Sequence, residues 1–132
     1  MSQENVEIVR AAFTAARDLD RRAAAAVFAP DAEWHNTTAF PGPRVCVGPD
    51  AIIDFWVTLV EDVATEGNEI EQVREFDGRV VVGFHQWGSG RRSGVPFDVR
   101  YAAIFELVDQ RIVRVVVHGH YANALEAVGL TG

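Results

Sequence analysis

The sequence predicts an α+β fold, with helices in its first half and a meander of strands in its second half. Residues 4–17 and 49–63 carry apolar side chains at spacings of three and four, which is the period of an amphipathic helix. After residue 68, four segments rich in Val, Ile and Phe alternate with turn residues, as antiparallel hairpins do. A chain of 132 residues that is 48% hydrophobic can build one core, so we expect a single domain over 1–132.

The first helix is expected over residues 4–17, where Val6, Val9 and Phe13 share one face. A second helix is expected over residues 21–28. Asp20 is a suitable N-cap for it, and Pro30 is expected to end it.

Residues 32–36 are predicted to form a short strand, and 45–47 a brief extended piece after a loop rich in Thr, Pro and Gly. Pro49 suits the first turn of a third helix, because its missing N–H would have no partner there. The apolar stripe of that helix is wide enough to lie across a sheet, and it comprises Ile52, Phe55, Trp56, Leu59, Val60 and Val63.

The meander is predicted to have strands at 69–76, 79–88, 97–108 and 111–120, and a short helix over 123–128 is expected to end at Gly129. If such a sheet curves strongly, helices over its concave face leave a cavity between the two layers.

The composition excludes several classes of function. The net charge is −7 and all twelve basic residues are Arg, so the chain lacks the basic face that a nucleic-acid partner needs. The N-terminus is polar, and no apolar run reaches the ~20 residues that span a bilayer. Cys46 is the only cysteine, which excludes an internal disulfide. We expect a cytoplasmic protein with no nucleic-acid partner, no membrane association and no cofactor.

Five segments resemble the SnoaL-like proteins of the nuclear-transport-factor-2-like superfamily. This family includes polyketide cyclases, ketosteroid isomerases and limonene epoxide hydrolases. The resemblance implies a cone-shaped, curved antiparallel sheet (an α+β barrel) with three helices from the N-terminal half packed over the concave face. It also implies a pocket at the wide end and a homodimer formed through the outer face of the sheet. The segments that carry the resemblance are residues 29–35, 47–52, 78–82, 109–115 and 124–130.

The catalytic groups of these relatives do not carry over to this chain. In SnoaL-type cyclases, an Asp on the last strand and a His one strand earlier correspond to Val117 and Ala103. The isomerase base corresponds to Asn36 and its oxyanion Asp again to Ala103. The Tyr-x-Asn water site of the epoxide hydrolases becomes Trp34-x-Asn36, and their last-strand Asp is again Val117. The resemblance therefore implies a pocket without the familiar acid/base chemistry of the fold.

Strand alternation and the resemblance together predict an apolar chamber with few polar groups, which is typical of a small-molecule site. The primary hypothesis is binding of a small apolar molecule, non-catalytic or of unknown activity. The alternative is an isomerase, cyclase or hydrolase that acts on a polyketide-, steroid- or terpenoid-like substrate through Tyr101, Asn36 and His35. A third possibility is an interaction domain with a vestigial pocket. The predicted wall comprises Phe13, Trp34, Asn36, Phe55, Leu59, Val82, Phe84, Gln86, Tyr101, Ala103, Phe105, Val115 and Val117.

The outer face of the sheet is expected to carry Trp87, Val116 and His118, which would form the homodimer interface. His118 and His120 share one face of a strand, and His85 could approach them from a neighbouring strand. Since histidines on an outer face more often serve an interface than bind a metal, no metal site is expected.

Overall fold

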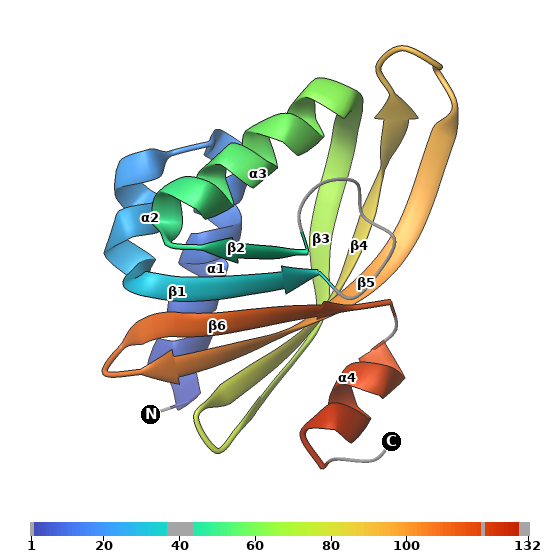
Figure 1. The fold of residues 1–132 in the computed structure, drawn as a ribbon. Helices are drawn as coiled ribbons and strands as arrows, with labels where there is room; N and C mark the ends of the chain where they lie inside the picture. Colours follow the sequence, from blue (N-terminus) through green and yellow to red (C-terminus); the bar gives the residue numbers. More distant parts are fainter. Residues whose placement is uncertain (1, 37–43, 120, 130–132) are drawn as a thin grey trace.

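The computed structural model describes residues 2–36, 44–119 and 121–129, and these build a curved sheet with helices on both sides (Figure 1). The strands lie in the order β2-β1-β6-β5-β4-β3. The elements of this described part are α1 (Ser2–Asp18), α2 (Arg21–Val27), β1 (Phe28–Asn36), β2 (Val45–Val47), α3 (Pro49–Asp62), β3 (Val63–Phe76), β4 (Arg79–Gly90), β5 (Pro96–Val108), β6 (Arg111–His118) and α4 (Tyr121–Ala127).

The predicted α+β class is confirmed, with two refinements to the sheet. First, β1 pairs with β6 in parallel, so that Trp34 lies beside Val115, whereas the other neighbouring strands are antiparallel. Second, the sheet stays open, with β2 and β3 as its edges. A parallel pair between segments about 80 residues apart leaves no hairpin signal in the sequence, so the pattern indicated antiparallel pairing for the meander and left the pairing of β1 undetermined.

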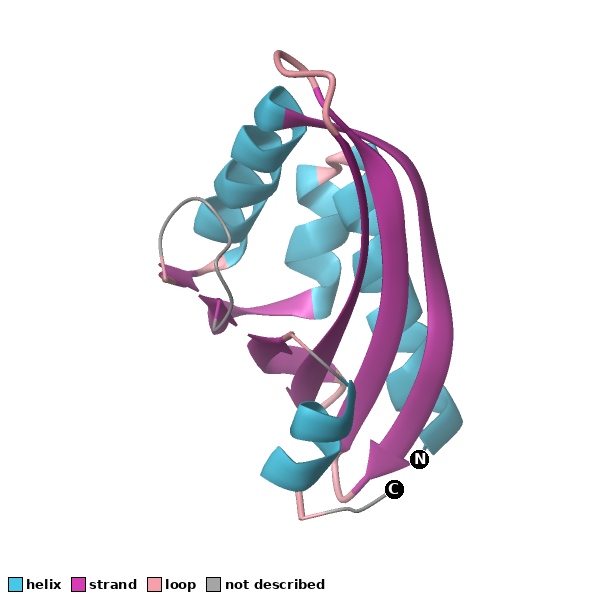
Figure 2. Ribbon diagram, turned by 90° about the vertical axis from the view of Figure 1, so that its right-hand side faces the viewer, coloured by secondary structure: helices cyan, strands magenta, loops and turns pink. Residues whose placement is uncertain are grey.

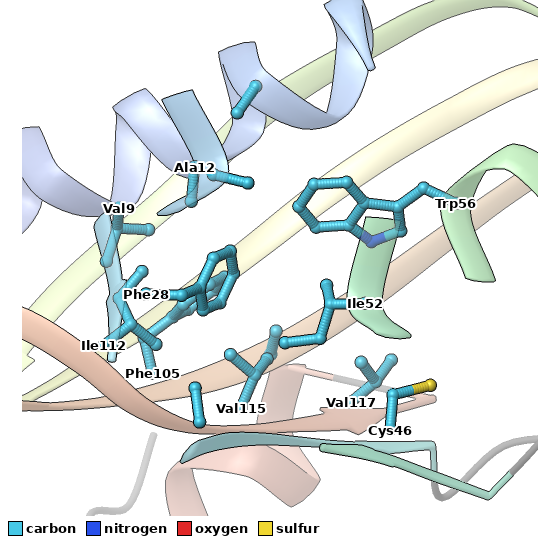
Figure 3. Close-up of a cluster of buried hydrophobic side chains, with 14 of the residues drawn as sticks. Val9, Ala12, Phe28, Cys46, Ile52, Trp56, Phe105, Ile112, Val115 and Val117 are labelled. Carbon is cyan, nitrogen blue, oxygen red and sulfur yellow. The ribbon is translucent and has the colours of Figure 1, made fainter. Parts of the chain in front are cut away.

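The three helices of the N-terminal half cover the concave side of the sheet, as predicted (Figures 1 and 2). The main core lies between these helices and the sheet, and fully buried side chains such as Phe28, Ile52 and Phe105 meet there (Figure 3). Helix α4 packs on the opposite face, where its Leu125 joins a second buried cluster with Ile104 of β5. No helix in the described part of the chain combines the length and apolarity needed to cross a membrane.

Two strands begin well before their predicted first residues. Strand β1 begins at Phe28 and runs through Pro30, because the ladder with β6 is irregular between Phe28 and Glu33 and needs no N–H from a proline there. Strand β3 begins at Val63, immediately after α3, rather than at residue 69. Residues 63–68, which the prediction left out of the strand, are extended because they pair with β4, for example Val63 with Gly90. They do not alternate between apolar and polar side chains, so the sequence pattern did not indicate a strand there.

Candidate functional site

A cavity of about 1170 Å³ lies between the concave face of the sheet and helices α1 and α3. Its wall is mostly aromatic and aliphatic, with a few polar side chains, which is the usual character of a small-molecule site. The structure brings eleven of the thirteen residues predicted for the wall together around this cavity: Phe13, Trp34, Asn36, Phe55, Leu59, Phe84, Gln86, Tyr101, Ala103, Phe105 and Val117.

Strand register explains why these residues meet. Phe84 of β4 lies opposite Tyr101 of β5, and Ala103 of β5 lies opposite Val117 of β6. Asn36 of β1 in turn lies beside Val117. Residues directly opposite one another point to the same face of a sheet. Since every second residue of a strand also points to that face, all of these side chains lie on the concave side together.

Val82 and Val115, which were also predicted to line the pocket, do not do so. Both are fully buried in the main core, with none of their surface exposed. They lie on the concave face as expected, but helices pack directly on that part of the sheet, so no cavity remains above them. Alternation identifies the face of a strand but not where along it the covering helices leave a gap.

Ring contacts tie the wall of the cavity together. The ring of Phe13 meets Phe84 edge to face, with centroids 5.3 Å apart, and Phe84 meets Tyr101 at 5.6 Å. On the opposite side, Trp34 meets Trp56 edge to face at 5.7 Å. Such pairs contribute about 0.5–1.5 kcal/mol each beyond their burial, so the wall is a preformed surface rather than a set of loose side chains.

Two polar side chains of the predicted wall, Asn36 and Tyr101, are placed at defined points. The indole Nε1–H of Trp34 donates to Oδ1 of Asn36 over 3.0 Å, and Asn36 is 7% exposed. Burial raises the pKa of the Tyr101 phenol above its usual value of about 10. Its hydroxyl therefore stays protonated at neutral pH and can donate a hydrogen bond, but it does not act as a base.

His35, which the alternative hypothesis offers as a catalytic residue, lies outside this wall. Its Nε2 is 2.7 Å from Oε1 of Glu33. Because successive residues of a strand alternate, Glu33 and His35 share the face opposite to Trp34 and Asn36. The irregularity of β1 precedes this segment and does not reverse it.

The wall also contains residues that sequence reasoning missed. Arg10, Thr14 and Arg17 lie on α1, and the helical spacing from Phe13 could have identified Arg10 and Arg17. Arg91, in the turn between β4 and β5, also lines the cavity, and no local pattern indicates this. The remaining additional residues are Ala12, Ala16, Trp56, Val60, Val63, Thr65, Glu66, Gly67, Asn68, Glu69, Ile70, Phe97 and Val99.

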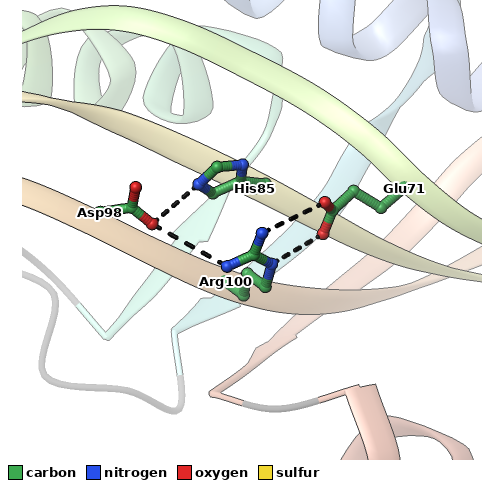
Figure 4. A network of polar contacts seen from close by, with 4 residues as sticks. All are labelled: Glu71, His85, Asp98 and Arg100. Carbon is green, nitrogen blue, oxygen red and sulfur yellow. Dashed lines mark hydrogen bonds and ion pairs between the residues drawn. The ribbon is translucent and has the colours of Figure 1, made fainter.

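The outer face carries a separate polar network beside the aromatic ring of Trp87. His85 lies 4.6 Å from Trp87, ring centroid to centroid, and its Nε2 is 2.8 Å from Oδ1 of Asp98 (Figure 4). Arg100 bridges Asp98 and Glu71, at 4.0 Å and 3.0 Å (Figure 4). Within the described residues, no three side chains of the His, Cys, Asp or Glu type are arranged to hold a metal ion.

The other two residues expected on this face, Val116 and His118, are half-buried and lie on β6. Burial lowers the pKa of His118 below its usual value, so its imidazole is neutral at neutral pH. Helix α4 covers the neighbouring part of the same face, which the sequence did not indicate.

Comparison with known proteins agrees with this architecture. The family model of the SnoaL-like domain matches residues 9–115. No curated protein matches the sequence significantly. Among solved structures, an NTF2-like protein from Burkholderia xenovorans has a TM-score of 0.79 at 22% identity, covering 88% of each chain. A protein from Jannaschia, named for its likeness to SnoaL-like polyketide cyclases, has a TM-score of 0.77 at 20% identity, covering 98% of this chain and 94% of its own. TerC, co-crystallised with polyporic acid, has a TM-score of 0.73 at 19% identity, covering 93% of this chain and 96% of its own.

Proposed function

The chain belongs to the SnoaL-like domain family, and we propose that it binds a small, largely apolar molecule in the cavity between the sheet and helices α1 and α3. The observation that carries this proposal is the cavity itself. About 1170 Å³ is slightly more than the roughly 300–1,000 Å³ typical of ligand sites, and a filled core would leave no such space. The same fold in TerC was crystallised with an organic molecule, polyporic acid.

Tyr101 is the best donor for such a ligand. Its hydroxyl is protonated at neutral pH, and its ring is held by Phe84. A ligand with one carbonyl oxygen could accept this hydrogen bond while its apolar body contacts the surrounding rings. The Trp34–Asn36 pair adds a second polar point in the wall.

Binding, rather than acid/base catalysis, fits the described wall best. The three positions where relatives hold their acid/base groups carry Asn36, Ala103 and Val117. An amide, a methyl group and an isopropyl group do not transfer protons in this pH range. His35, the only imidazole in the alternative hypothesis, lies outside the wall and is bonded to Glu33.

A matched pair of neutral ligands tests the proposal. 2-Acetylnaphthalene and 2-ethylnaphthalene have nearly the same shape, but only the first has a carbonyl oxygen. Isothermal titration calorimetry is expected to show that both bind and that the acetyl compound binds several-fold tighter. Tyr101→Phe is expected to remove that difference while retaining the binding of the ethyl compound.

A blocking variant locates the site. Val99→Trp places an indole in the cavity and is expected to abolish binding of both compounds, since Val99 lines the wall. Val108→Trp is the matched control, because Val108 lies at the far end of the same strand and is 57% exposed. Unchanged binding in the Val99→Trp variant would place the ligand elsewhere and contradict the proposal.

A further inference from the structure

The charged residues of the cavity wall have the opposite balance to the chain as a whole. The chain has 12 basic and 19 acidic residues. The wall contains three of the arginines, Arg10, Arg17 and Arg91, but only two acidic residues, Glu66 and Glu69. Because a protein of net charge −7 repels anions in general, a basic wall is a local feature that needs its own explanation.

The backbone register makes the imbalance larger. Glu69 lies opposite His85, which faces the outer side of the sheet and bonds to Asp98 there. Since opposite residues in an antiparallel pair point to the same face, the Glu69 carboxylate points away from the cavity. The charged residues that remain in the wall are Arg10, Arg17, Arg91 and Glu66, and of these Arg17 is ion-paired with Asp18.

Arg91 is the best-placed of these arginines. Its Nε donates to the backbone oxygen of Val60, and its own backbone N–H donates to the oxygen of Asp62 over 3.0 Å. Both acceptors lie in the last turn of α3, where the helix dipole favours a cation. Although Arg91 is exposed, this hydrogen bond positions its side chain at the cavity before any ligand binds, which lowers the entropy cost of using it.

The hydrogen bond from Arg91 to Val60 leaves most N–H groups of the guanidinium available to a ligand. An arginine has five N–H donors, and the contact with Val60 uses one. The Nη groups of Arg91 have no hydrogen-bond partner among the residues that the structure describes. Arg17, by contrast, is paired with Asp18. Arg91 therefore offers a fixed guanidinium edge of the shape that a carboxylate accepts in bidentate fashion.

We propose that the ligand of this cavity is an anionic amphiphile, whose apolar body lies among the aromatic rings and whose carboxylate is bound by Arg91. This inference rests on the proposed binding function and adds the sign and the position of the ligand's charge. The apolar end contacts Phe84, Phe105 and Val117, and the charged end reaches the turn between β4 and β5.

Three ligands that share one ten-carbon chain test the proposal: decanoate, decan-1-ol and protonated decylamine. Each is titrated calorimetrically at neutral pH, below its micelle-forming concentration. Decanoate is expected to bind about tenfold tighter than the alcohol, the lower end of what a charge-assisted hydrogen bond contributes. Only decanoate binding should weaken markedly as salt is raised from 0.05 to 0.5 M.

The variant Arg91→Gln is expected to reduce decanoate affinity to that of the alcohol and to leave alcohol binding unchanged. Arg92→Gln is the matched control, because Arg92 is the next residue of the same turn and is exposed like Arg91, but does not line the cavity. Equal loss of decanoate affinity in both variants would show a general charge effect and would overturn the assignment to Arg91.

The outcomes separate this inference from the proposed function. If the alcohol binds as tightly as decanoate, or the amine binds more tightly, the cavity holds apolar molecules but the charge assignment is wrong. If none of the three ligands binds, and the naphthalene pair does not bind either, the proposed function fails and this inference fails with it.

Discussion

Replacing Ala103 with aspartate tests how dry the cavity wall is. Ala103 is 2% exposed, and its neighbours across the sheet are Val82 and Val117. An isolated carboxylate at such a site loses its hydration, and its pKa rises by about 3 units from about 3.9. At about 1.4 kcal/mol per unit, the ionised side chain would cost about 4 kcal/mol at pH 8.

The sign of the pH dependence follows from this shift. Below about pH 4 the aspartate is protonated in both the folded and the unfolded chain, so its ionisation has no effect on stability. As the pH rises, the unfolded chain ionises first, and the folded state loses stability until the pH passes the folded pKa. Relative to the parent, the ionisation penalty of Ala103→Asp is therefore about 1.5 kcal/mol at pH 5 and about 4 kcal/mol at pH 8.

Urea unfolding followed by tryptophan fluorescence at pH 5 and pH 8 measures the free energy of unfolding directly. Ala103→Asn is the control of similar size, and its cost should not change with pH. If Ala103→Asp is as stable as the parent at pH 8, water reaches Ala103 and the picture of a dry, apolar wall is refuted.

Three further predictions concern other parts of the molecule. A Cβ added at Gly67 would lie 2.0 Å from Cζ2 of Trp87, so Gly67→Ala should lower the free energy of unfolding by about 1–3 kcal/mol. Adding Trp87→Leu to that variant should recover most of the loss, and additive costs in a double-mutant cycle would contradict the contact. Burial raises the pKa of Tyr101, so stability should fall as the pH rises above about 10, and Tyr101→Phe should remove that fall in urea unfolding; an equal fall in the variant would contradict the assignment. The predicted homodimer through the outer face should sediment as a dimer and become monomeric in Trp87→Asp, whereas a parent that is monomeric at all concentrations would contradict that interface.

Much of the cavity wall could be predicted because it depends on two simple periods. Tyr101, Ala103 and Phe105 alternate along β5, and Phe55 and Leu59 are one helical turn apart on α3. These spacings place side chains on one face whatever the rest of the chain does. An inward-turned His35 would have needed a bulge beside it, but the irregularity of β1 lies before Glu33 and the alternation continues through His35.

The sequence by itself determined the fold class and which side chains share one face of a helix or strand. Hydrophobic period and turn residues act locally, so a single chain displays them directly. Only the tertiary structure decided which part of that face stays open. Val82 and Val115 alternate in step with Ala103 and Val117, yet the helices cover the first pair and leave the second at the cavity. The position of Arg91 at the cavity also depends on tertiary structure, because the carbonyl oxygens that it bonds to belong to a helix about 30 residues earlier in the chain.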